Sequence, residues 1–269
     1  MGIEIGALNA YASVLDHAAL HAREVDRITL SLGELAIPDA YRIQDEVIAS
    51  RVRRGEAVIG LKMGLTSLAK MRQMKVDSPI YGVLTDSMRI PAGGEIALPG
   101  RIHPKIEPEV AFILGRDLSG PVDAATALSA CSGVCAAMEI IDSRYRNFNF
   151  TLPDVIADNC SSSGFVLGEV IRSPSEVDLG NLGMMMEISG KGSQFGSSAA
   201  IYGHPAESLA ELCRMLHARG LPGLKAGMIV LAGGATEAVM LEAGDRVSLS
   251  VQGLGTVSVT VSAIGGGVS

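Results

Sequence analysis

The sequence lacks an excess of basic residues, since its 22 lysines and arginines are outnumbered by 29 aspartates and glutamates and the net charge is -7. Nucleic acids require a basic patch and membrane surfaces attract basic segments, so the composition disfavours both partners. Charged residues make up 19% of the chain and hydrophobic residues 48%. This balance is typical of a compact globular enzyme and excludes a disordered chain.

Cysteines and long apolar runs are also scarce. The four cysteines, Cys131, Cys135, Cys160 and Cys213, match neither a zinc-binding pattern nor the C-x-x-C redox motif. We expect free thiols in a cytoplasmic protein. No stretch is long enough for a membrane-spanning helix. Residues 1–20 have no basic segment followed by an apolar run, so we predict no signal peptide.

The first third of the sequence has helical periodicity. Residues 39–55 carry an apolar stripe, with Pro38 at the start, Asp39 as the predicted cap and Gly55 at the end. A short strand is predicted over 56–65.

The next segment is predicted to hold a helix and a loop. Ser67 is the predicted cap of a helix over 68–76. Residues 77–84, DSPIYGVL, are predicted to be a loop because Pro79 and Gly82 both interrupt regular structure.

From about residue 90 the chain is rich in strand patterns, interrupted by helical ones. The predicted strands are 94–98, 107–114, 133–141, 163–171 and 182–190, and the predicted helices are 122–131 and 205–220. The remainder reads as strands with hairpin connections at 242–245 and 253–255. We therefore predict an α+β protein with an N-terminal helical region, residues 1–80, followed by a larger β-rich domain, residues 81–269.

Acidic residues occur where a strand enters the apolar core. Glu107 and Glu109 are two positions apart, and alternate side chains of a strand share one face. Two neighbouring carboxylates repel, and their burial without a partner is costly. Either water covers this face or a cation lies between the two carboxylates.

A further acid, Glu139, lies alone in the apolar strand VCAAMEII. Three carboxylates without a nearby histidine favour a hard cation such as Mg²⁺ or Mn²⁺. The alternative is that Glu107 and Glu109 face water and that Glu139 pairs with an arginine such as Arg144.

Lys62, in GLKMGL, is a charge within a short apolar strand. It can stabilise an enolate or hold a carboxylate beside a metal. The alternative is that Lys62 reaches the surface from an edge strand.

Two polar loops are further candidates. Residues 157–164, ADNCSSSG, present hydroxyl and amide donors, but without a G-x-S-x-G motif Ser161 is only weakly indicated as a nucleophile. Residues 231–236, LAGGAT, form either a cradle for a carboxylate or a hairpin turn, and match neither a P-loop nor a dinucleotide fingerprint.

Several segments occur in an order typical of one family: GLKMGLTS, VDSPIYG, HPKIEPEVAF, EIIDSRYRNFNF, ADNCSSSG, GHPAESLA, LAGGAT and GDRVSLSVQGLGTVSV. From about residue 39 to the C-terminus, the chain resembles the hydratase/decarboxylase family of the fumarylacetoacetate hydrolase superfamily. The resemblance implies a mixed β-roll with an N-terminal helical region. Cys160 departs from the alanine usual in the family, which concerns only the shape of its loop.

The resemblance also implies a site. One divalent cation, Mg²⁺ or Mn²⁺, would be bound by Glu107, Glu109 and Glu139. The catalytic residue would be Lys62. The residues expected to bind substrate are Lys62, Asp77, Ser161 and Thr236.

Two activities occur in this family. Hydratases tend to have PDFG and SRIRDW where this chain has PIYG, residues 79–82, and SRYRNF, residues 143–148. The resemblance therefore implies a carbon-carbon lyase of the meta-cleavage degradation of aromatic compounds. Its reaction would convert 4-oxalocrotonate to 2-hydroxypenta-2,4-dienoate and CO₂. Tyr81, Tyr145 and Phe148 are candidates to shape the pocket around the departing carboxylate.

Two alternatives remain open. The chain resembles a 2-hydroxypenta-2,4-dienoate hydratase in the same motifs, or it is a catalytically silent partner of the pathway's hydratase. A scaffold has no need of converging carboxylates, which argues against the second. Expected partners are a small 2-oxo dicarboxylate, the pathway's hydratase and further copies of this chain.

Overall fold

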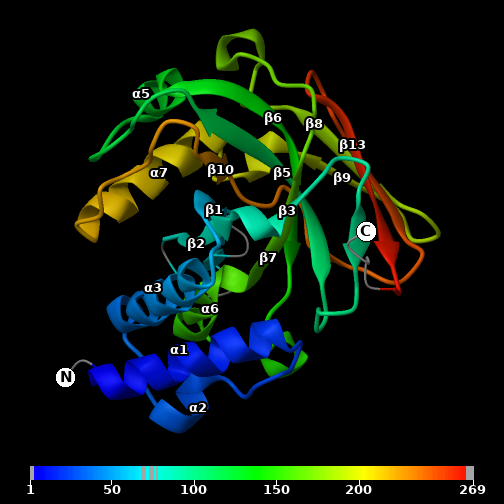
Figure 1. Ribbon diagram of the computed structural model, residues 1–269. Coiled ribbons are helices and arrows are strands. Elements are labelled where there is room, and N and C mark those ends of the chain that lie inside the picture. Colours follow the sequence, from blue (N-terminus) through cyan, green and yellow to red (C-terminus); the bar gives the residue numbers. More distant parts are fainter. Residues whose placement is uncertain (1–2, 68–70, 73–75, 77, 265–269) are drawn as a thin grey trace.

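The computed structural model describes residues 3–67, 71–72, 76 and 78–264, and within these a helical N-terminal region lies beside two β-sheets (Figure 1). The predicted α+β class, with helices first and a mixed β-structure after them, is confirmed. The predicted boundary between residues 80 and 81 stays a prediction. The strand that precedes it, β1 (Val58–Gly64), is hydrogen-bonded within the larger sheet.

The N-terminal region consists of α1 (Ile5–Leu20), α2 (Ile28–Leu32) and α3 (Ile37–Arg53), shown in blue in Figure 1. The predicted helix over 39–55 is confirmed as α3, with Pro38 in its first turn. The prediction of Asp39 as the cap is wrong, because the helix begins earlier and Ala36 takes that position. The Asp39 carboxylate instead accepts a hydrogen bond from the Ile3 N–H at 3.0 Å and so holds the start of the chain.

The larger sheet has the strand order β2–β1–β10–β5–β6–β7–β3, with β11 paired to the start of β5. Its other strands are β2 (Ile80–Thr85), β3 (Arg89–Ile90), β5 (Lys105–Leu114), β6 (Cys131–Ile141), β7 (Ser162–Leu167), β10 (Ile229–Leu231) and β11 (Val239–Met240). β5 and β6 pair antiparallel along almost their whole length. Both faces of these strands are buried, which is why their sequences read as nearly continuous apolar runs.

The smaller sheet has the strand order β4–β13–β12–β8–β9. Its strands are β4 (Glu95–Ala97), β8 (Gly183–Ile188), β9 (Gly192–Ser197), β12 (Arg246–Val251) and β13 (Gly255–Ser262). Buried and accessible residues alternate along β12 and β13, so one face of this sheet packs on the core. The predicted hairpin at 253–255 is confirmed between β12 and β13. The one predicted at 242–245 is wrong, because this segment passes from β11 in the larger sheet to β12 in the smaller one.

Shorter helices complete the fold: α5 (Ala124–Ser129), α6 (Leu152–Ala157) and α7 (Pro205–Ala218). The predicted helices over 122–131 and 205–220 are confirmed as α5 and α7. The sequence patterns did not indicate α6, which begins with a capping box formed by Thr151 and Asp154. α6 packs on α3 and leads directly into the turn of Asn159–Ser161, so it connects the helical region to the sheet.

The prediction of a loop over residues 77–84 is wrong where the structure describes it, because β2 begins at Ile80. Pro79 precedes the strand and removes no ladder hydrogen bond. Gly82 is required inside the strand, since a Cβ at this position would lie 2.7 Å from the carbonyl oxygen of Asn159. The predicted helix over 68–76 lies largely outside the described residues.

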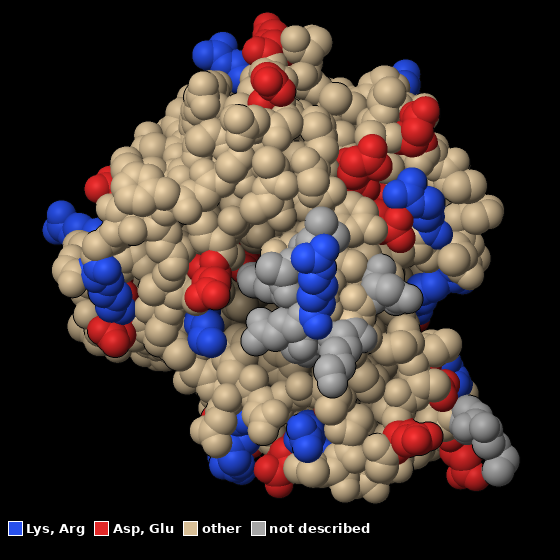
Figure 2. Space-filling model, turned by 180° about the vertical axis from the view of Figure 1, so that it is seen from behind, with Lys and Arg blue, Asp and Glu red and all other residues tan. Residues whose placement is uncertain are grey.

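Surface charge is mixed on the face shown in Figure 2, where lysines and arginines alternate with acidic residues and neither sign forms a broad patch. None of the helices in the described part of the chain combines the length and the apolar character that crossing a membrane demands.

Candidate metal centre and substrate site

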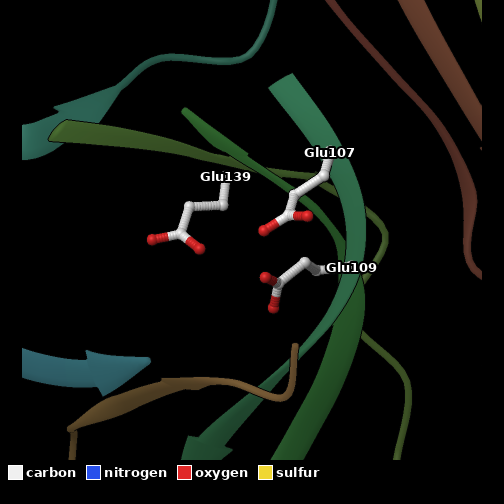
Figure 3. A group of neighbouring side chains, drawn as sticks. All are labelled: Glu107, Glu109 and Glu139. Atoms are coloured by element: carbon white, nitrogen blue, oxygen red, sulfur yellow. The ribbon is translucent and has the colours of Figure 1, made fainter. Parts of the chain in front are cut away.

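The antiparallel pairing of β5 and β6 brings three glutamates together. Glu107 lies directly opposite Glu139 in the ladder, and Glu109 follows two positions later on the same face. Their side chains point toward one another (Figure 3), and one oxygen from each carboxylate lies within 4.8 Å of the others. The spacing seen in the sequence therefore places these carboxylates around one point in space.

These carboxylates are buried. Glu109 and Glu139 are 0% exposed, and Glu107 is 8% exposed. Burial raises the pKa of Glu109 well above its usual value, and the charges of Glu139 and Glu107 raise it further. Burial also raises the pKa of Glu139 to about 7, with Lys62 acting in the opposite direction. Among the described residues, Oε1 of Glu109 and Oε1 of Glu139 have no hydrogen-bond partner.

A hard divalent cation fits this arrangement. Converging carboxylate oxygens without histidine or cysteine are the ligands that Mg²⁺ and Mn²⁺ prefer. The buried oxygens without partners are also those that a cation would satisfy. The interpretation in which water covers this face is wrong, since the side chains are buried. Glu139 does not pair with Arg144, because the guanidinium of Arg144 is bound to Asp158 instead.

Lys62 extends from β1 into the same group. Its Nζ lies 2.8 Å from Oε2 of Glu139, and the side chain is 3% exposed. β1 lies between β2 and β10, so the interpretation of Lys62 as an edge-strand residue that reaches the surface is wrong. Burial lowers the pKa of Lys62, but the negative charges around it, first Glu139 and then Glu107 and Glu109, together outweigh burial and the net shift is upward. Lys62 therefore remains an ammonium group beside the carboxylates.

The glycine loop 231–236 packs against the glutamates. The Gly233 N–H donates a hydrogen bond to Oε2 of Glu109 at 2.7 Å. A Cβ at Gly234 would lie 2.4 Å from Oε2 of Glu107, so only glycine fits there. The sequence left open whether this loop cradles a carboxylate. In the structure it does so for a carboxylate of the protein itself, which fixes the orientation of a candidate metal ligand.

The turn of Asn159–Ser161 lies where α6 meets the larger sheet. All three residues have positive φ angles, of 49°, 52° and 59°, a conformation that costs energy in residues other than glycine. The side chain of Asn159 holds the turn, because it accepts from the Val83 N–H at 2.7 Å and donates to the Val83 carbonyl at 2.9 Å. Cys160 donates through its Sγ to the Tyr81 carbonyl at 3.0 Å. The turn is therefore fastened to β2.

The strained turn presents Ser161, one of the residues predicted to bind substrate. Ser161 is 2% exposed, and its Oγ has no hydrogen-bond partner among the residues described. A buried hydroxyl without a partner is unusual and is explained if a ligand supplies the partner. Burial raises the pKa of the neighbouring Cys160 to about 12, so this residue contributes a neutral thiol.

The other predicted substrate-binding residues are less defined. Asp77 lies outside the described residues. Thr236 follows the glycine loop, and its hydroxyl donates to Oε1 of Gln194 at 2.7 Å. The contribution of both residues to substrate binding stays a prediction.

Two of the aromatic residues considered for the pocket, Tyr81 and Tyr145, belong to the core. Tyr81 neighbours Gly82, which pairs with Lys62, so its side chain points to the opposite face of β2, where it stacks on Tyr41. Tyr145 is fully buried and donates to the Asp154 carbonyl at 3.0 Å. Tyr81 and Tyr145 are therefore core residues.

Phe148, the remaining aromatic candidate, packs against His103 with 4.9 Å between the ring centroids. Its ring also lies beneath the ammonium group of Lys105, at 4.2 Å from the centroid. Lys105 is two positions before Glu107 on the same face of β5, so the contribution of Phe148 to the pocket stays a prediction.

Sequence reasoning did not identify Asn159 and Gly82 as parts of the site. The sequence did hold an indication of Asn159. Asparagine tolerates a positive φ angle, and Asn159 follows an aspartate in a loop of small residues. Gly82 was interpreted as a loop residue, and its close contact with the turn is visible only in three dimensions.

Comparison with known proteins supports these observations. The model of the fumarylacetoacetate (FAA) hydrolase C-terminal family matches residues 58–262. A 4-oxalocrotonate decarboxylase from Pseudomonas sp. is 45% identical over 251 residues, which cover 93% of this chain and 96% of the relative. A 2-hydroxyhexa-2,4-dienoate hydratase from Comamonas testosteroni is 37% identical over 248 residues, covering 91% of this chain and 94% of the relative.

The architecture agrees with a solved structure over nearly its whole length. The 4-oxalocrotonate decarboxylase from Pseudomonas putida G7, complexed with magnesium and adipate, matches with a TM-score of 0.93 and 39% sequence identity. The match covers 96% of this chain and 98% of that one.

Proposed function

Because the chain belongs to the fumarylacetoacetate hydrolase family, we propose that it is a carboxy-lyase that converts 4-oxalocrotonate to 2-hydroxypenta-2,4-dienoate and CO₂ with Mg²⁺ or Mn²⁺. The observation that carries the proposal is the buried pair of Lys62 and Glu139 beside Glu107 and Glu109. The higher identity to a decarboxylase than to a hydratase favours decarboxylation.

Glu107, Glu109 and Glu139 would hold the cation. When bound, a divalent cation supplies Lewis-acid polarisation of a substrate's 2-oxo group. The chain's own contribution is to keep the ligands in place: Gly233 fixes the Glu109 carboxylate, and the β5–β6 ladder fixes the register of Glu107 and Glu139. The side chains of the site are also buried, which strengthens each electrostatic interaction among them.

Lys62 would stabilise the charge that develops during the reaction. When the bond to the far carboxylate breaks and CO₂ leaves, the electron pair moves through the conjugated carbons to the oxygen on C2. That oxygen becomes negative and later takes up one proton to give the dienol. The Lys62 ammonium is already placed and needs no reorganisation, which is the condition under which such stabilisation is most effective.

Ser161 would bind and orient the substrate. Its buried hydroxyl has no protein partner among the described residues, so a substrate carboxylate can accept its hydrogen bond. Asn159 and Cys160 would act through Ser161 by fastening the turn to β2. Binding by Asp77 and Thr236, and a complex with the pathway's hydratase, remain expectations from the family resemblance.

The test is a product assay. Purified protein with Mg²⁺ and 4-oxalocrotonate should release CO₂ and accumulate 2-hydroxypenta-2,4-dienoate, and a chelator should stop both. When supplied directly, the dienoate should be hydrated slowly or not at all. Rapid hydration of the dienoate without CO₂ release from 4-oxalocrotonate would establish the hydratase instead. Mg²⁺ binding without either turnover would support the catalytically silent partner.

A further inference from the structure

A separate cavity of about 370 Å³ lies between the N-terminal helices and the far end of the larger sheet. Its walls come from α1, α3, the segment around β4 and the ends of β6 and β7. The arginines that line it are Arg51, Arg54, Arg101 and Arg144. None of the glutamates of the candidate metal centre belongs to its lining.

Arg101, in the wall of this cavity, lies over the face of the larger sheet opposite to those glutamates. Arg101 covers Gly164, where a Cβ would lie 3.3 Å from its Nη2. Gly164 pairs with Ile140 in the β6–β7 ladder. Because neighbouring residues of a strand point to opposite faces, the side chain of Ile140 faces away from that of Glu139. The glutamates do not line the cavity, although Ser162, which does, also lies beside Glu139.

Arg51 is the unusual member of this cavity. It is only 9% exposed, yet its guanidinium forms no hydrogen bond or ion pair with any residue that the structure describes. A guanidinium carries five donors, and burying them without acceptors is costly. Burial lowers the pKa of Arg51 and the positive charge of Arg144 lowers it further, while the carboxylates of Glu56, Asp16 and Asp158 act in the opposite direction without reversing the net downward shift.

Arg101 also lacks a carboxylate in direct contact with its guanidinium. Its guanidinium donates to the hydroxyl and the carbonyl of Ser163 but has no carboxylate partner among the described residues. Burial also lowers its pKa. Arg144, by contrast, is fully engaged by Asp158 and by backbone carbonyls. Arg51 and Arg101 are therefore the arginines of this cavity without a directly bound carboxylate among the described residues.

The acids in the cavity wall offset the charges of Arg51 and Arg101 only in part, because the pKa of each arginine stays lowered. Asp16 is bound bidentately by Arg54, at 2.5 and 2.7 Å. Asp142 accepts the backbone N–H groups of Ile102 and His103, at 2.9 and 2.8 Å.

The other acids of the wall are occupied or exposed. Oε2 of Glu56 accepts the hydroxyls of Thr85 and Ser87, and Glu95 is exposed to solvent. A ligand that brings its own negative charge is what this cavity lacks.

We propose that this cavity is a second ligand site, which binds a small oxyanion, a phosphate or a short carboxylate, through Arg51 and Arg101. The planar forks of guanidinium groups match the paired oxygens of both anions. A volume of about 370 Å³ accommodates such an ion together with water. The site is independent of the proposed decarboxylation, because it shares none of the residues assigned to that reaction.

The experiment measures binding of inorganic phosphate and, separately, of succinate to the Mg²⁺-loaded protein by calorimetry, at constant ionic strength with chloride as the reference ion. At least one of the two anions should bind saturably and raise the melting temperature. Arg51→Met and Arg101→Met should each weaken that binding at least tenfold, the loss expected for a charge-assisted hydrogen bond. Whichever anion binds more tightly identifies the chemical class of the ligand.

Arg53→Met is the matched control. Arg53 lies on the same helix but is exposed and pairs with Glu46, so its loss should leave anion binding unchanged. Without an anion, Arg51→Met should retain the stability of the wild type or exceed it, since it removes an uncompensated buried charge. A large loss of stability would instead assign Arg51 a structural role.

Two results would overturn the proposal. One is that neither anion shifts the melting temperature more than chloride does. The other is that binding survives both Arg51→Met and Arg101→Met and disappears when Mg²⁺ is removed, which would place the anion at the metal centre.

Discussion

Two ion pairs in the described part of the chain have both side chains almost completely buried: Lys62 with Glu139, and Arg144 with Asp158. They differ in how fully they are hydrogen-bonded. We call Arg144 with Asp158 the saturated pair and Lys62 with Glu139 the open pair. The Arg144 guanidinium donates to the Asp158 carboxylate and to the carbonyls of Asp142, Asp158 and Ser162. At the other pair, Oε1 of Glu139 has no partner among the described residues, and two further carboxylates lie beside it.

We expect this difference to separate a structural pair from a functional one. A buried pair whose hydrogen bonds are all satisfied costs little to keep and fixes the surrounding backbone. A buried pair with oxygens left over carries an electrostatic cost that a bound cation or a proton can offset. The turn of Asn159–Ser161 directly follows Asp158, so the saturated pair anchors the segment that presents Ser161. Substitutions at each pair can test this division.

Breaking the saturated pair should have the largest effect on stability. Arg144→Met leaves the Asp158 carboxylate buried without its partner, and we expect a loss of about 3–5 kcal/mol in the free energy of unfolding. Urea denaturation measures this loss. Arg146→Met is the control, since Arg146 is exposed and its pairs with Glu24 and Asp26 should contribute less than about 1 kcal/mol. Equal effects of the two substitutions would refute the structural role of Arg144.

Breaking the open pair should affect activity more than stability. Lys62→Met removes the charge that stabilises the developing oxyanion, and we expect kcat to fall by about 10²–10³-fold. Unfolding should change little, because the pKa of Glu139 is already raised to about 7 and its carboxyl can take up a proton. Steady-state kinetics with the proposed substrate measures the effect, and Lys225→Met, at an exposed lysine, is the control. A change confined to KM would assign Lys62 to substrate binding alone.

The same contrast explains what the sequence predicted. Glu107, Glu109 and Lys62 were identifiable because a charge within an apolar strand violates a local pattern, and a violation of this kind marks a functional site. The α+β class, α3, α7 and the central strands follow from periodicity in the same way.

Other features depend on contacts between segments distant in the sequence. The strand character of β2 arises because Gly82 receives the turn at Asn159, and no local pattern encodes that approach. The pairing of Arg144 with Asp158, in place of Glu139, required the position of α6, which the sequence patterns did not indicate. Strand register and contacts between distant segments set these features, more than the types of the residues do.

Removing one carboxylate beside the open pair sharpens the comparison. Glu109→Gln keeps an acceptor for the Gly233 N–H but removes the ionisable carboxyl group. Burial and the neighbouring Glu139 and Glu107 raise the pKa of that carboxyl group. Without metal, the variant should unfold with a free energy about 1 kcal/mol higher than the wild type. Mg²⁺ should bind more than about tenfold more weakly, because a ligand is lost. Melting temperatures with and without Mg²⁺ test both effects, and an unchanged Mg²⁺-induced shift would contradict the assignment.

A substitution in the turn of Asn159–Ser161 should lower both the free energy of unfolding and kcat. Asn159→Gly tolerates the positive φ but deletes both hydrogen bonds to Val83, and we expect a loss of about 1–2 kcal/mol. kcat should fall as well, because Ser161 is no longer held. Cys160→Ala is the milder comparison, since it removes only the thiol contact to Tyr81. If Asn159→Gly lowered stability without changing kcat or KM, the turn would be structural only.

Ser161→Ala should have the smallest effect on stability and still affect substrate binding. The hydroxyl is buried without a partner among the described residues, so its removal should leave the free energy of unfolding within about 0.5 kcal/mol of the wild type, or raise it. If the hydroxyl donates to a substrate carboxylate, KM should rise by about tenfold, the value of one such hydrogen bond. Ser163→Ala is the matched control, because Ser163 lies on β7 and its hydroxyl is occupied by Arg101. Loss of stability with an unchanged KM would show that the partner of Ser161 is part of the protein, and the turn would then belong with the saturated pair.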